Sequence, residues 1–155
     1  MIDLHEEFVG IARAFGQRDI PYALCGGLAM AAYGFPRATV DIDFLVPDDR
    51  MNDAQACLRE LGYDHESGWM SFAGGKVRLF RVVKLDPAAG DFLVVDLLAA
   101  AGDLAAVWEQ RRLRETDDGS VWIVSRPGLI AMKGKRGSQQ DLADIENLEG
   151  ISDED

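Results

Sequence analysis

The chain has few of the side chains that build zinc sites, disulfide frameworks or histidine-based triads. It contains two cysteines and two histidines among 155 residues. Cys25 and Cys57 belong to no CxxC pair and no cluster with zinc-ligand spacing, so we expect reduced, structural thiols. His5 and His65 are isolated, which excludes a histidine-based triad and favours surface or satisfied core positions.

Long apolar runs are also missing. No stretch approaches the roughly 20 apolar residues of a membrane helix, and residues 1–18 lack the basic and then apolar profile of a signal peptide. We therefore expect no membrane association and a cytoplasmic location. The sequence has neither a GxxxxGKS/T loop nor a GxGxxG after a strand, which excludes two common nucleotide-binding patterns.

Positive charge is scarce. The chain carries 16 Lys and Arg against 27 Asp and Glu, a formal net charge of −11. Residues 141–155 have seven acidic and no basic side chains, so they hold −7 of this charge and residues 1–140 hold −4. The body is thus only mildly acidic, but it lacks the basic surface of a general nucleic-acid binder. A small molecule, a protein and a locally bound RNA end all stay open as partners.

The remaining composition is that of a globular domain, with 48% hydrophobic and 28% charged residues. This length is enough for one domain with a substantial core. We expect a single domain over residues 1–150, with a catalytic core at about 20–100 and a C-terminal helical part at about 101–150. Residues 151–155 are expected to form an acidic tail.

Hydrophobic periodicity, together with the positions of glycine, proline and helix-capping residues, predicts an alternation of strands and helices. Helices are predicted over residues 3–18, 28–33, 51–61, 104–108, 126–133 and 139–149. Strands are predicted over residues 20–25, 40–46, 76–85, 91–98 and 121–124, while 63–72 is ambiguous. This order indicates an α/β (α+β) class.

Three details of the C-terminal part are specific enough to test. The helix that Ser125 caps is expected to run to about Lys133 and to be broken by Gly134-Lys135-Arg136-Gly137, and Ser138 is expected to cap the next helix. In that last helix, Leu142, Ile145 and Leu148 have the spacing of a buried stripe. The arginine run at 111–114 either lines a site or, as we favour, forms a solvated face.

The most informative stretch is residues 24–46, LCGGLAMAAYGFPRATVDIDFLV. Side chains alternate along a strand, so Asp41 and Asp43 point to one face while Ile42 points to the other. Two carboxylates so close together repel by roughly 1 to 4 kcal/mol depending on the local dielectric. A hard divalent cation, Mg²⁺ or Mn²⁺, relieves this repulsion. The glycines at 26 and 27 leave backbone N–H groups open to an anion such as phosphate.

Together these residues resemble the DNA polymerase β-like nucleotidyltransferases, whose pattern is an apolar residue, Gly-Gly or Gly-Ser, about a dozen residues, and Asp-x-Asp/Glu. The fuller form, GG-x-A-x-x-x-YG-x-x-R-x-T-x-DID, is similar to a minimal bacterial branch with abortive-infection toxins and some aminoglycoside nucleotidyltransferases. The resemblance implies a small mixed sheet flanked by helices, followed by C-terminal helices. It also implies a third carboxylate on a later strand, and Asp96 in Val95-Asp96-Leu97 matches it. The alternative for Asp96 is a strand-end carboxylate that reaches solvent.

The resemblance also implies roles for these residues. Asp41 and Asp43 would bind both metals, and Asp96 would bind the catalytic metal and help to deprotonate the acceptor hydroxyl. Gly26 and Gly27 would contact the β- and γ-phosphates of a nucleoside triphosphate (NTP).

Three further positions are weaker predictions. Arg37 and Lys133 are candidates for triphosphate contacts, and Thr39 is either a hydrogen-bonding residue near the metals or an ordinary strand residue. The LIAMK stretch, followed by an arginine and two aspartates, resembles the tail of these minimal transferases. Gln140 departs from that pattern, because a lysine is usual there.

We therefore predict a metal-dependent enzyme that transfers a nucleoside monophosphate (NMP) from ATP or another NTP to a hydroxyl acceptor. The acceptor would be a small molecule, a tRNA end or a protein, and the setting could be a toxin–antitoxin or phage-defence system. A homodimer or a cognate partner protein could complete the cleft. The alternative is a catalytically inactive nucleotide-binding or regulatory domain of the same fold.

Overall fold

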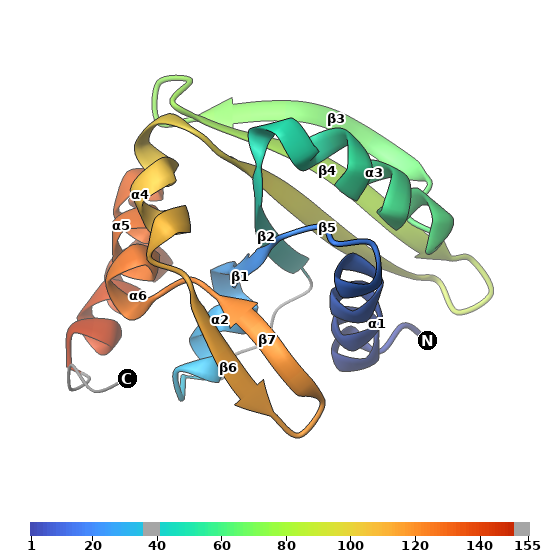
Figure 1. The fold of residues 1–155 in the computed structure, drawn as a ribbon, viewed down its shortest axis with the longest axis horizontal. Helices are drawn as coiled ribbons and strands as arrows, with labels where there is room; N and C mark the ends of the chain where they lie inside the picture. Colours follow the sequence, from blue (N-terminus) through green and yellow to red (C-terminus); the bar gives the residue numbers. More distant parts are fainter. Residues whose placement is uncertain (36–40, 151–155) are drawn as a thin grey trace.

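The computed structural model describes residues 1–35 and 41–150, which form one mixed sheet with helices packed around it (Figure 1). The strands are β1 Ala23–Cys25, β2 Asp41–Pro47, β3 His65–Phe72, β4 Val77–Asp86, β5 Asp91–Ala100, β6 Arg112–Thr116 and β7 Gly119–Ile123. The α-helices are α1 Leu4–Gln17, α2 Gly26–Ala32, α3 Met51–Glu60, α4 Ala105–Glu109, α5 Arg126–Arg136 and α6 Gln139–Glu149. Two short 3₁₀ turns, η1 Asp48–Arg50 and η2 Gly102–Leu104, precede α3 and α4.

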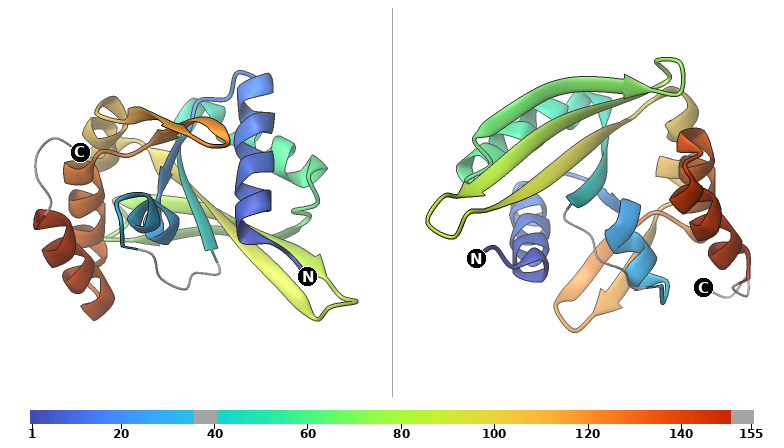
Figure 2. Two further views of the ribbon diagram at one scale, coloured as in Figure 1. Left: turned by 90° about the horizontal axis from the view of Figure 1, so that it is seen from below. Right: turned by 180° about the vertical axis from the view of Figure 1, so that it is seen from behind.

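The strand order within the described residues is β3-β4-β5-β2-β1-β7-β6. β2 pairs in parallel with β5 and β1 pairs in parallel with β7, while the other neighbouring strands are antiparallel. Helices α1 and α3 lie on one side of the sheet, and α2, α5 and α6 lie on the other (Figure 1 and Figure 2). The predicted mixed α/β fold is confirmed.

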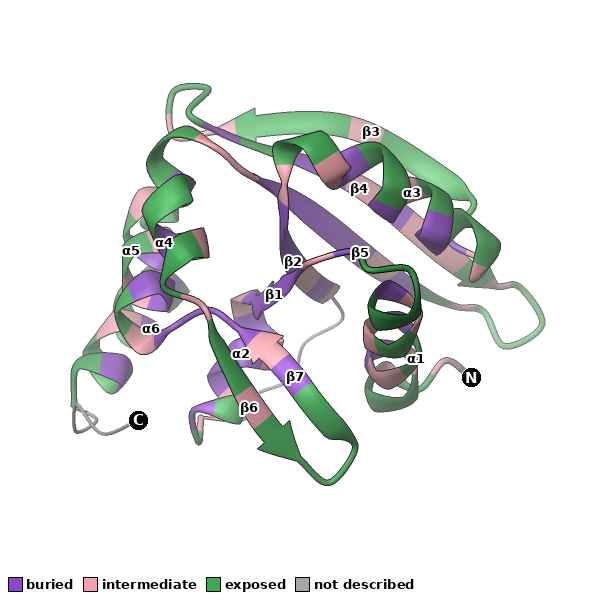
Figure 3. Cartoon of the chain, viewed as in Figure 1, coloured by how far each residue is buried: buried purple, intermediate pink, exposed green. Residues whose placement is uncertain are grey.

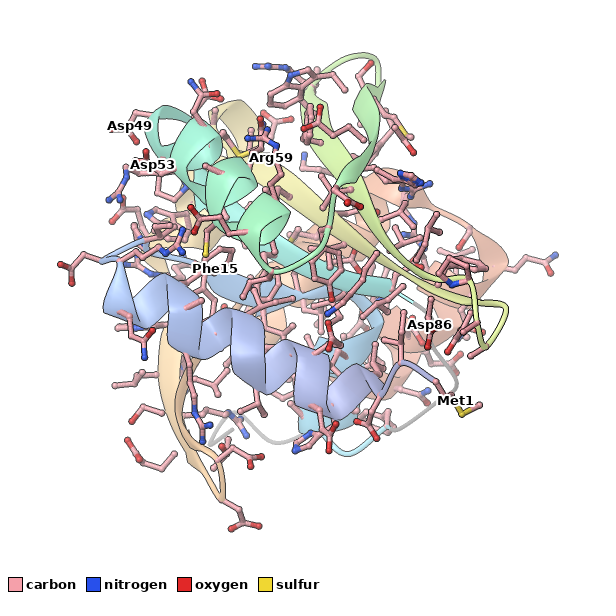
Figure 4. The ribbon with its side chains drawn as sticks, turned by 90° about the vertical axis from the view of Figure 1, so that its right-hand side faces the viewer. Met1, Phe15, Asp49, Asp53, Arg59 and Asp86 are labelled. Carbon is pink, nitrogen blue, oxygen red and sulfur yellow. The ribbon has the colours of Figure 1, made fainter. Side chains whose placement is uncertain are left out.

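Helix α1 forms because its N-terminus is capped and one of its faces is apolar. The Asp3 Oδ1 atom accepts a hydrogen bond of 2.9 Å from the backbone N–H of Glu6. Phe15 is fully buried and its ring meets the Phe44 ring of β2 edge-on at 5.4 Å. Figure 4 shows Phe15 in the space between α1 and α3.

Burial falls from the centre of the sheet to its edges (Figure 3). β1 is buried throughout and β2 is buried at four of its seven residues. By contrast, none of the eight residues of the edge strand β3 is fully buried. The central strands β1, β2 and β5 are therefore the most buried part of the sheet, and they carry the candidate site.

Several local predictions need correction. The first strand is only Ala23–Cys25, and α2 begins at Gly26, so the glycine pair forms the first turn of the helix and does not precede it. The ambiguous stretch is β3, and most of the arginine run at 111–114 lies in the edge strand β6. Residues 101–150 therefore add β6 and β7 to the sheet as well as supplying helices.

The C-terminal helices differ from prediction in two ways. The helix α5 does not end at Gly134 but continues to Arg136, and Gly137 ends it in the left-handed conformation with φ of 66°. In α6 the capping box of Ser138 is present as predicted. Leu142, however, is 58% exposed, and the buried residues of α6 are Asp141, Asp144 and Leu148.

Two smaller expectations hold. Both cysteine thiols are free and buried. His5 is exposed and its Nε2 lies 2.8 Å from Asp118 Oδ2.

No helix among residues 1–35 and 41–150 is long and apolar enough to cross a membrane. The chain start is held near the β4–β5 turn, because the N-terminal ammonium of Met1 donates to Asp86 at 3.0 Å (Figure 4).

Candidate active site

A pocket of about 380 Å³ lies over the face of the central strands, between the sheet and α5. One half of its lining is charged and contains Asp41, Asp43, Asp96, Arg81, Lys133 and Arg136. The other half is apolar and contains Met70, Val77, Leu79, Leu98, Leu104 and Leu129. A concave site of this size with a few convergent polar groups suits a small-molecule substrate or cofactor.

The two acidic residues of β2 face the charged half of this pocket. Asp41 and Asp43 alternate with the fully buried Ile42, as the strand pattern predicts. Burial, together with the Asp96 and Asp41 carboxylates, raises the pKa of Asp43 to about 7. Burial and the Asp96 carboxylate also raise the pKa of Asp41. Burial and mutual repulsion thus both disfavour the charged forms of these two carboxylates.

Asp96 lies on the same face of the sheet, on the neighbouring strand. β5 runs parallel to β2 with Asp96 opposite Asp43, and opposite residues of paired strands point to one face. Asp96 is 4% exposed, so it is not a strand-end carboxylate that reaches bulk solvent. The structure therefore brings together all three carboxylates that the sequence singles out.

Arg81, a residue that the sequence analysis did not single out, binds Asp96 from the next strand. β4 places Arg81 directly opposite Asp96. Its Nε donates to Asp96 Oδ1 at 2.8 Å and its Nη2 donates to Asp96 Oδ2 at 2.9 Å. These hydrogen bonds to Asp96 raise the pKa of the guanidinium further, so it stays charged at any ordinary pH.

The donor set fits a hard divalent cation at Asp41 and Asp43. Their carboxylates share a face, line the pocket and have raised pKa values, which a bound cation would reverse. Among residues 1–35 and 41–150, however, no three acidic, histidine or cysteine side chains are already arranged around one metal position. Both oxygens of the third carboxylate, Asp96, accept hydrogen bonds from Arg81.

Gly26 borders the carboxylates because no other residue fits there. It has φ of 69°, and a Cβ on it would lie 2.1 Å from Asp43 Oδ2. Gly27 follows in the first turn of α2 and is buried. The N–H groups of a first helical turn have no partner within the helix, which leaves them available to an anion. Of the two predicted phosphate-binding glycines, only Gly26 lines the pocket.

Lys133 enters the pocket from α5 and is held by two buried acids of α6. Its Nζ lies 2.9 Å from Asp144 Oδ2 and 3.7 Å from Asp141 Oδ1. Asp141 also accepts hydrogen bonds from Ser138 and Arg136. Burial would raise the pKa of Asp141, but these hydrogen bonds outweigh it and hold the pKa below its ordinary value.

The position that departs from the family pattern keeps a polar role. Gln140 Nε2 donates to Asp144 Oδ1 at 2.9 Å, so it supports the acid that holds Lys133. Arg37 and Thr39, two further predicted site residues, lie outside the described residues.

The arginine run is not part of the pocket lining. The Arg111 guanidinium stacks on the Trp108 ring at 3.9 Å and on the Trp122 ring at 4.9 Å. Arg114 stacks on the Tyr33 ring at 4.7 Å. At least these two arginines therefore fasten β6 to its neighbours.

Solved structures show the same fold. The chain superimposes on the lincosamide antibiotic adenylyltransferase LnuA with a TM-score of 0.65 and 17% identity, covering 97% of this chain and 99% of that one. The antibiotic-resistance factor ANT(2'')-Ia gives a TM-score of 0.62 and 17% identity, covering 95% and 84%. A candidate nucleotidyltransferase from Thermotoga maritima gives 0.58 and 16%, covering 96% and 91%.

The sequence itself points to one family. None of the curated proteins that were compared matches the chain. Residues 11–93 match the family model described as nucleotidyl transferase AbiEii toxin, type IV toxin–antitoxin system. That match spans more than half of the 155 residues and includes the glycine turn and the carboxylates of β2. The chain therefore belongs to the AbiEii toxin family of nucleotidyltransferases.

Proposed function

We propose that the protein transfers an NMP from an NTP to a hydroxyl acceptor, which attacks the α-phosphorus and releases pyrophosphate, in a reaction that needs a divalent metal. The observation that carries this proposal is the placement of Asp41, Asp43 and Asp96 on one face of two paired central strands, in the floor of one pocket. We further propose that residues 1–150 act as a single domain, which is supported by the sheet that strands from both halves share.

Asp41 and Asp43 would hold Mg²⁺ or Mn²⁺, and Asp96 would join them as the third carboxylate ligand. When bound, the cations would stabilise the negative charge on the attacking and leaving oxygens of the transfer. The chain's own contribution is alignment, because phosphoryl chemistry of this kind needs little covalent help from the protein. Asp96 would accept the proton of the acceptor hydroxyl.

The triphosphate would lie between α2 and α5. The N–H groups of Gly26 and Gly27 would donate to its outer phosphates. Lys133 would face it as a positive charge whose position is fixed by Asp144, 2.9 Å away. Arg37 and Thr39 stay predictions from the sequence for the same end of the substrate.

The acceptor would lie on the opposite side of Asp96, against the apolar half of the pocket. Across the sheet, β4 and β3 follow β5 on the side away from β2 and Gly26. Leu79 and Met70 lie opposite each other on these two strands, and both line the pocket. An acceptor with an apolar or aromatic part next to its hydroxyl fits this surface.

A second candidate function is a nucleotide-binding domain without catalytic turnover. One observation favours it, namely that Arg81 already satisfies both oxygens of Asp96. This candidate predicts NTP binding without labelled product across a broad set of acceptors.

The decisive experiment incubates the protein with each labelled NTP, Mg²⁺ or Mn²⁺ and a cell extract, and then identifies the labelled product. We expect transfer with the wild type and none with Asp43→Ala. Asp49→Ala is the matched control, because Asp49 is an exposed acid on η1 outside the pocket lining. Full transfer by Asp43→Ala would refute the assignment of the site.

A biological test addresses the toxin–antitoxin setting. We expect expression of the wild type to arrest growth and expression of Asp43→Ala to leave growth unchanged. Co-expression of the neighbouring gene product should relieve the arrest if that product is the cognate partner. A drug-modifying enzyme would instead raise resistance without arresting growth.

A further inference from the structure

The Arg81–Asp96 pair occupies the carboxylate that the proposed chemistry needs. The contact is bidentate, with donor–acceptor distances of 2.8 and 2.9 Å, and each guanidinium nitrogen takes a different carboxylate oxygen. Paired hydrogen bonds between charged groups are the strongest that a protein makes. Asp96 is 4% exposed, so Arg81 is its main charge partner in the described structure and little water reaches it.

Strand register explains why this pair affects the metal position. Arg81, Asp96 and Asp43 lie in one row across β4, β5 and β2. Arg81 is at the outer end of the row, so its hydrogen bonds direct the Asp96 carboxylate toward β4 and away from Asp43. This orientation accounts for the finding that the described residues contain no ready-made group of three metal ligands.

We propose that Arg81 is a positioning residue that competes with the divalent cation for Asp96. In the metal-free protein Arg81 neutralises Asp96, and binding of the cation requires Asp96 to release at least one of its two bonds to Arg81. This inference rests on the proposed function, because it takes Asp96 to be a ligand of the metal.

Arg81 has room to release its partner. Its side chain is 34% exposed and lines the pocket, so the freed guanidinium can be solvated or can face a negatively charged substrate. The consequence is an ordered site, in which the third carboxylate joins the metal cluster only after the cation has replaced Arg81.

The competing explanation is that Arg81 only orients Asp96. A carboxylate has lone pairs beyond the two that a bidentate arginine uses, and outer-shell partners often strengthen metal ligands. The two explanations predict opposite signs. Competition predicts tighter metal binding when Arg81 is removed, whereas orientation predicts weaker binding.

The test is a calorimetric titration of the full chain with Mn²⁺ alone, without NTP, at constant pH and ionic strength. We expect Arg81→Met to bind Mn²⁺ roughly three- to tenfold more tightly than the wild type. Arg81→Lys keeps the charge but cannot form the paired bonds, so we expect it to fall between the two. Unchanged or weaker binding in both variants would overturn the proposal.

Two controls separate this result from other causes. Arg78→Met removes the same charge from the same strand outside the pocket lining, and it should leave Mn²⁺ binding unchanged. In an Asp96→Asn background, Arg81→Met should give no further tightening, because the contested ligand is gone. If it still tightens binding there, simple charge repulsion is the cause and the competition is refuted.

Failure of the proposed function would look different. If Asp43→Asn binds Mn²⁺ as well as the wild type does, the metal position itself is wrong. If Mn²⁺ binding needs Asp43 but is the same in the wild type and the Arg81 variants, the metal position is correct and only the role of Arg81 is wrong. A variant that does not fold is identified by circular dichroism. If Arg81→Met does not fold, Arg81→Lys shows whether Mn²⁺ binding becomes tighter or weaker.

Discussion

A Cβ atom on Gly26 would lie 2.1 Å from Oδ2 of Asp43 and 2.7 Å from its Cγ. The backbone of Gly26 is also in the left-handed region, with φ of 69°. A side chain at this position would therefore strain the turn into α2 and displace a carboxylate of the proposed metal site.

We expect Gly26→Ala to reduce NMP transfer by at least about a hundredfold and to lower the free energy of unfolding by about 2 kcal/mol. Urea unfolding and labelled transfer measure the two effects. Gly74→Ala is the matched control, since Gly74 has nearly the same φ of 67° but no atom within 4 Å of its Cβ position. Gly74→Ala should lower the free energy of unfolding by about 1 kcal/mol, from backbone strain alone, and should keep full NMP transfer. Equal loss of activity in both variants would disprove the steric argument.

The two lysines of α5 offer a comparison of buried and exposed ion pairs. Lys133 is 6% exposed and lies 2.9 Å from the buried Asp144, whereas Lys135 lies 3.0 Å from the exposed Asp103. Lys133→Met removes the ammonium group that lies 2.9 Å from the buried Asp144, so we expect a loss of about 3 kcal/mol in the free energy of unfolding. Lys135→Met should cost less than about 1 kcal/mol. If urea denaturation gives similar losses in the free energy of unfolding for Lys133→Met and Lys135→Met, Lys133 is not the centre of the α5–α6 contact.

Much of this site could be predicted from sequence, because its main residues follow strand alternation. Asp41 and Asp43 share a face for that reason, and Asp96 stands out as a charge within an apolar strand. The position of Arg81 opposite Asp96 could also have been predicted from the sequence. The predicted strands 76–85 and 91–98 are joined by a short turn, across which the structure pairs Asp86 with Asp91, and counting five residues back and forward from this pair reaches Arg81 and Asp96.

Other features depend on tertiary contacts that a local pattern does not contain. The stripe predicted for α6 is correct at Leu148 but wrong at Leu142, because Lys133 of the preceding helix pairs with Asp144 and the buried face includes acidic residues. Gly134 was expected to end α5, but one glycine costs only about 1 kcal/mol in a helix and packing exceeds that. The edge strands β3 and β6 escaped detection because neither has a cleanly alternating buried face.

The pKa of Asp43 predicts an unusual dependence of stability on pH. In the metal-free folded protein this pKa is about 7, against an ordinary value of 3.8. Between these values the folded state binds more protons than the unfolded state, so the contribution of Asp43 to the free energy of unfolding falls as pH rises from about 4 to about 7.

We expect Asp43→Asn to remove this slope and to be more stable than the wild type by about 2 kcal/mol at pH 8 without metal. Urea unfolding between pH 4 and pH 8, in buffer that contains a chelator, measures the dependence of stability on pH, with Asp49→Asn as a control at an exposed acid. Addition of Mn²⁺ at pH 8 should stabilise the wild type and not Asp43→Asn. A wild type whose stability rises over this pH interval in parallel with Asp43→Asn would contradict the raised pKa.

The apolar half of the pocket yields a prediction about the acceptor. Met70 lines the pocket on the edge strand β3 and is 37% exposed, so Met70→Gln changes the polarity of the wall with little effect on folding. We expect the KM for the acceptor that labelling identifies to rise about fivefold, since a contact worth about 1 kcal/mol is lost, while the KM for NTP stays constant. Leu85→Gln is the control, because Leu85 is 45% exposed on β4 but does not line the pocket. A rise in the KM for NTP would mean that the apolar wall holds the nucleobase, and the acceptor would then have to approach Asp96 from elsewhere.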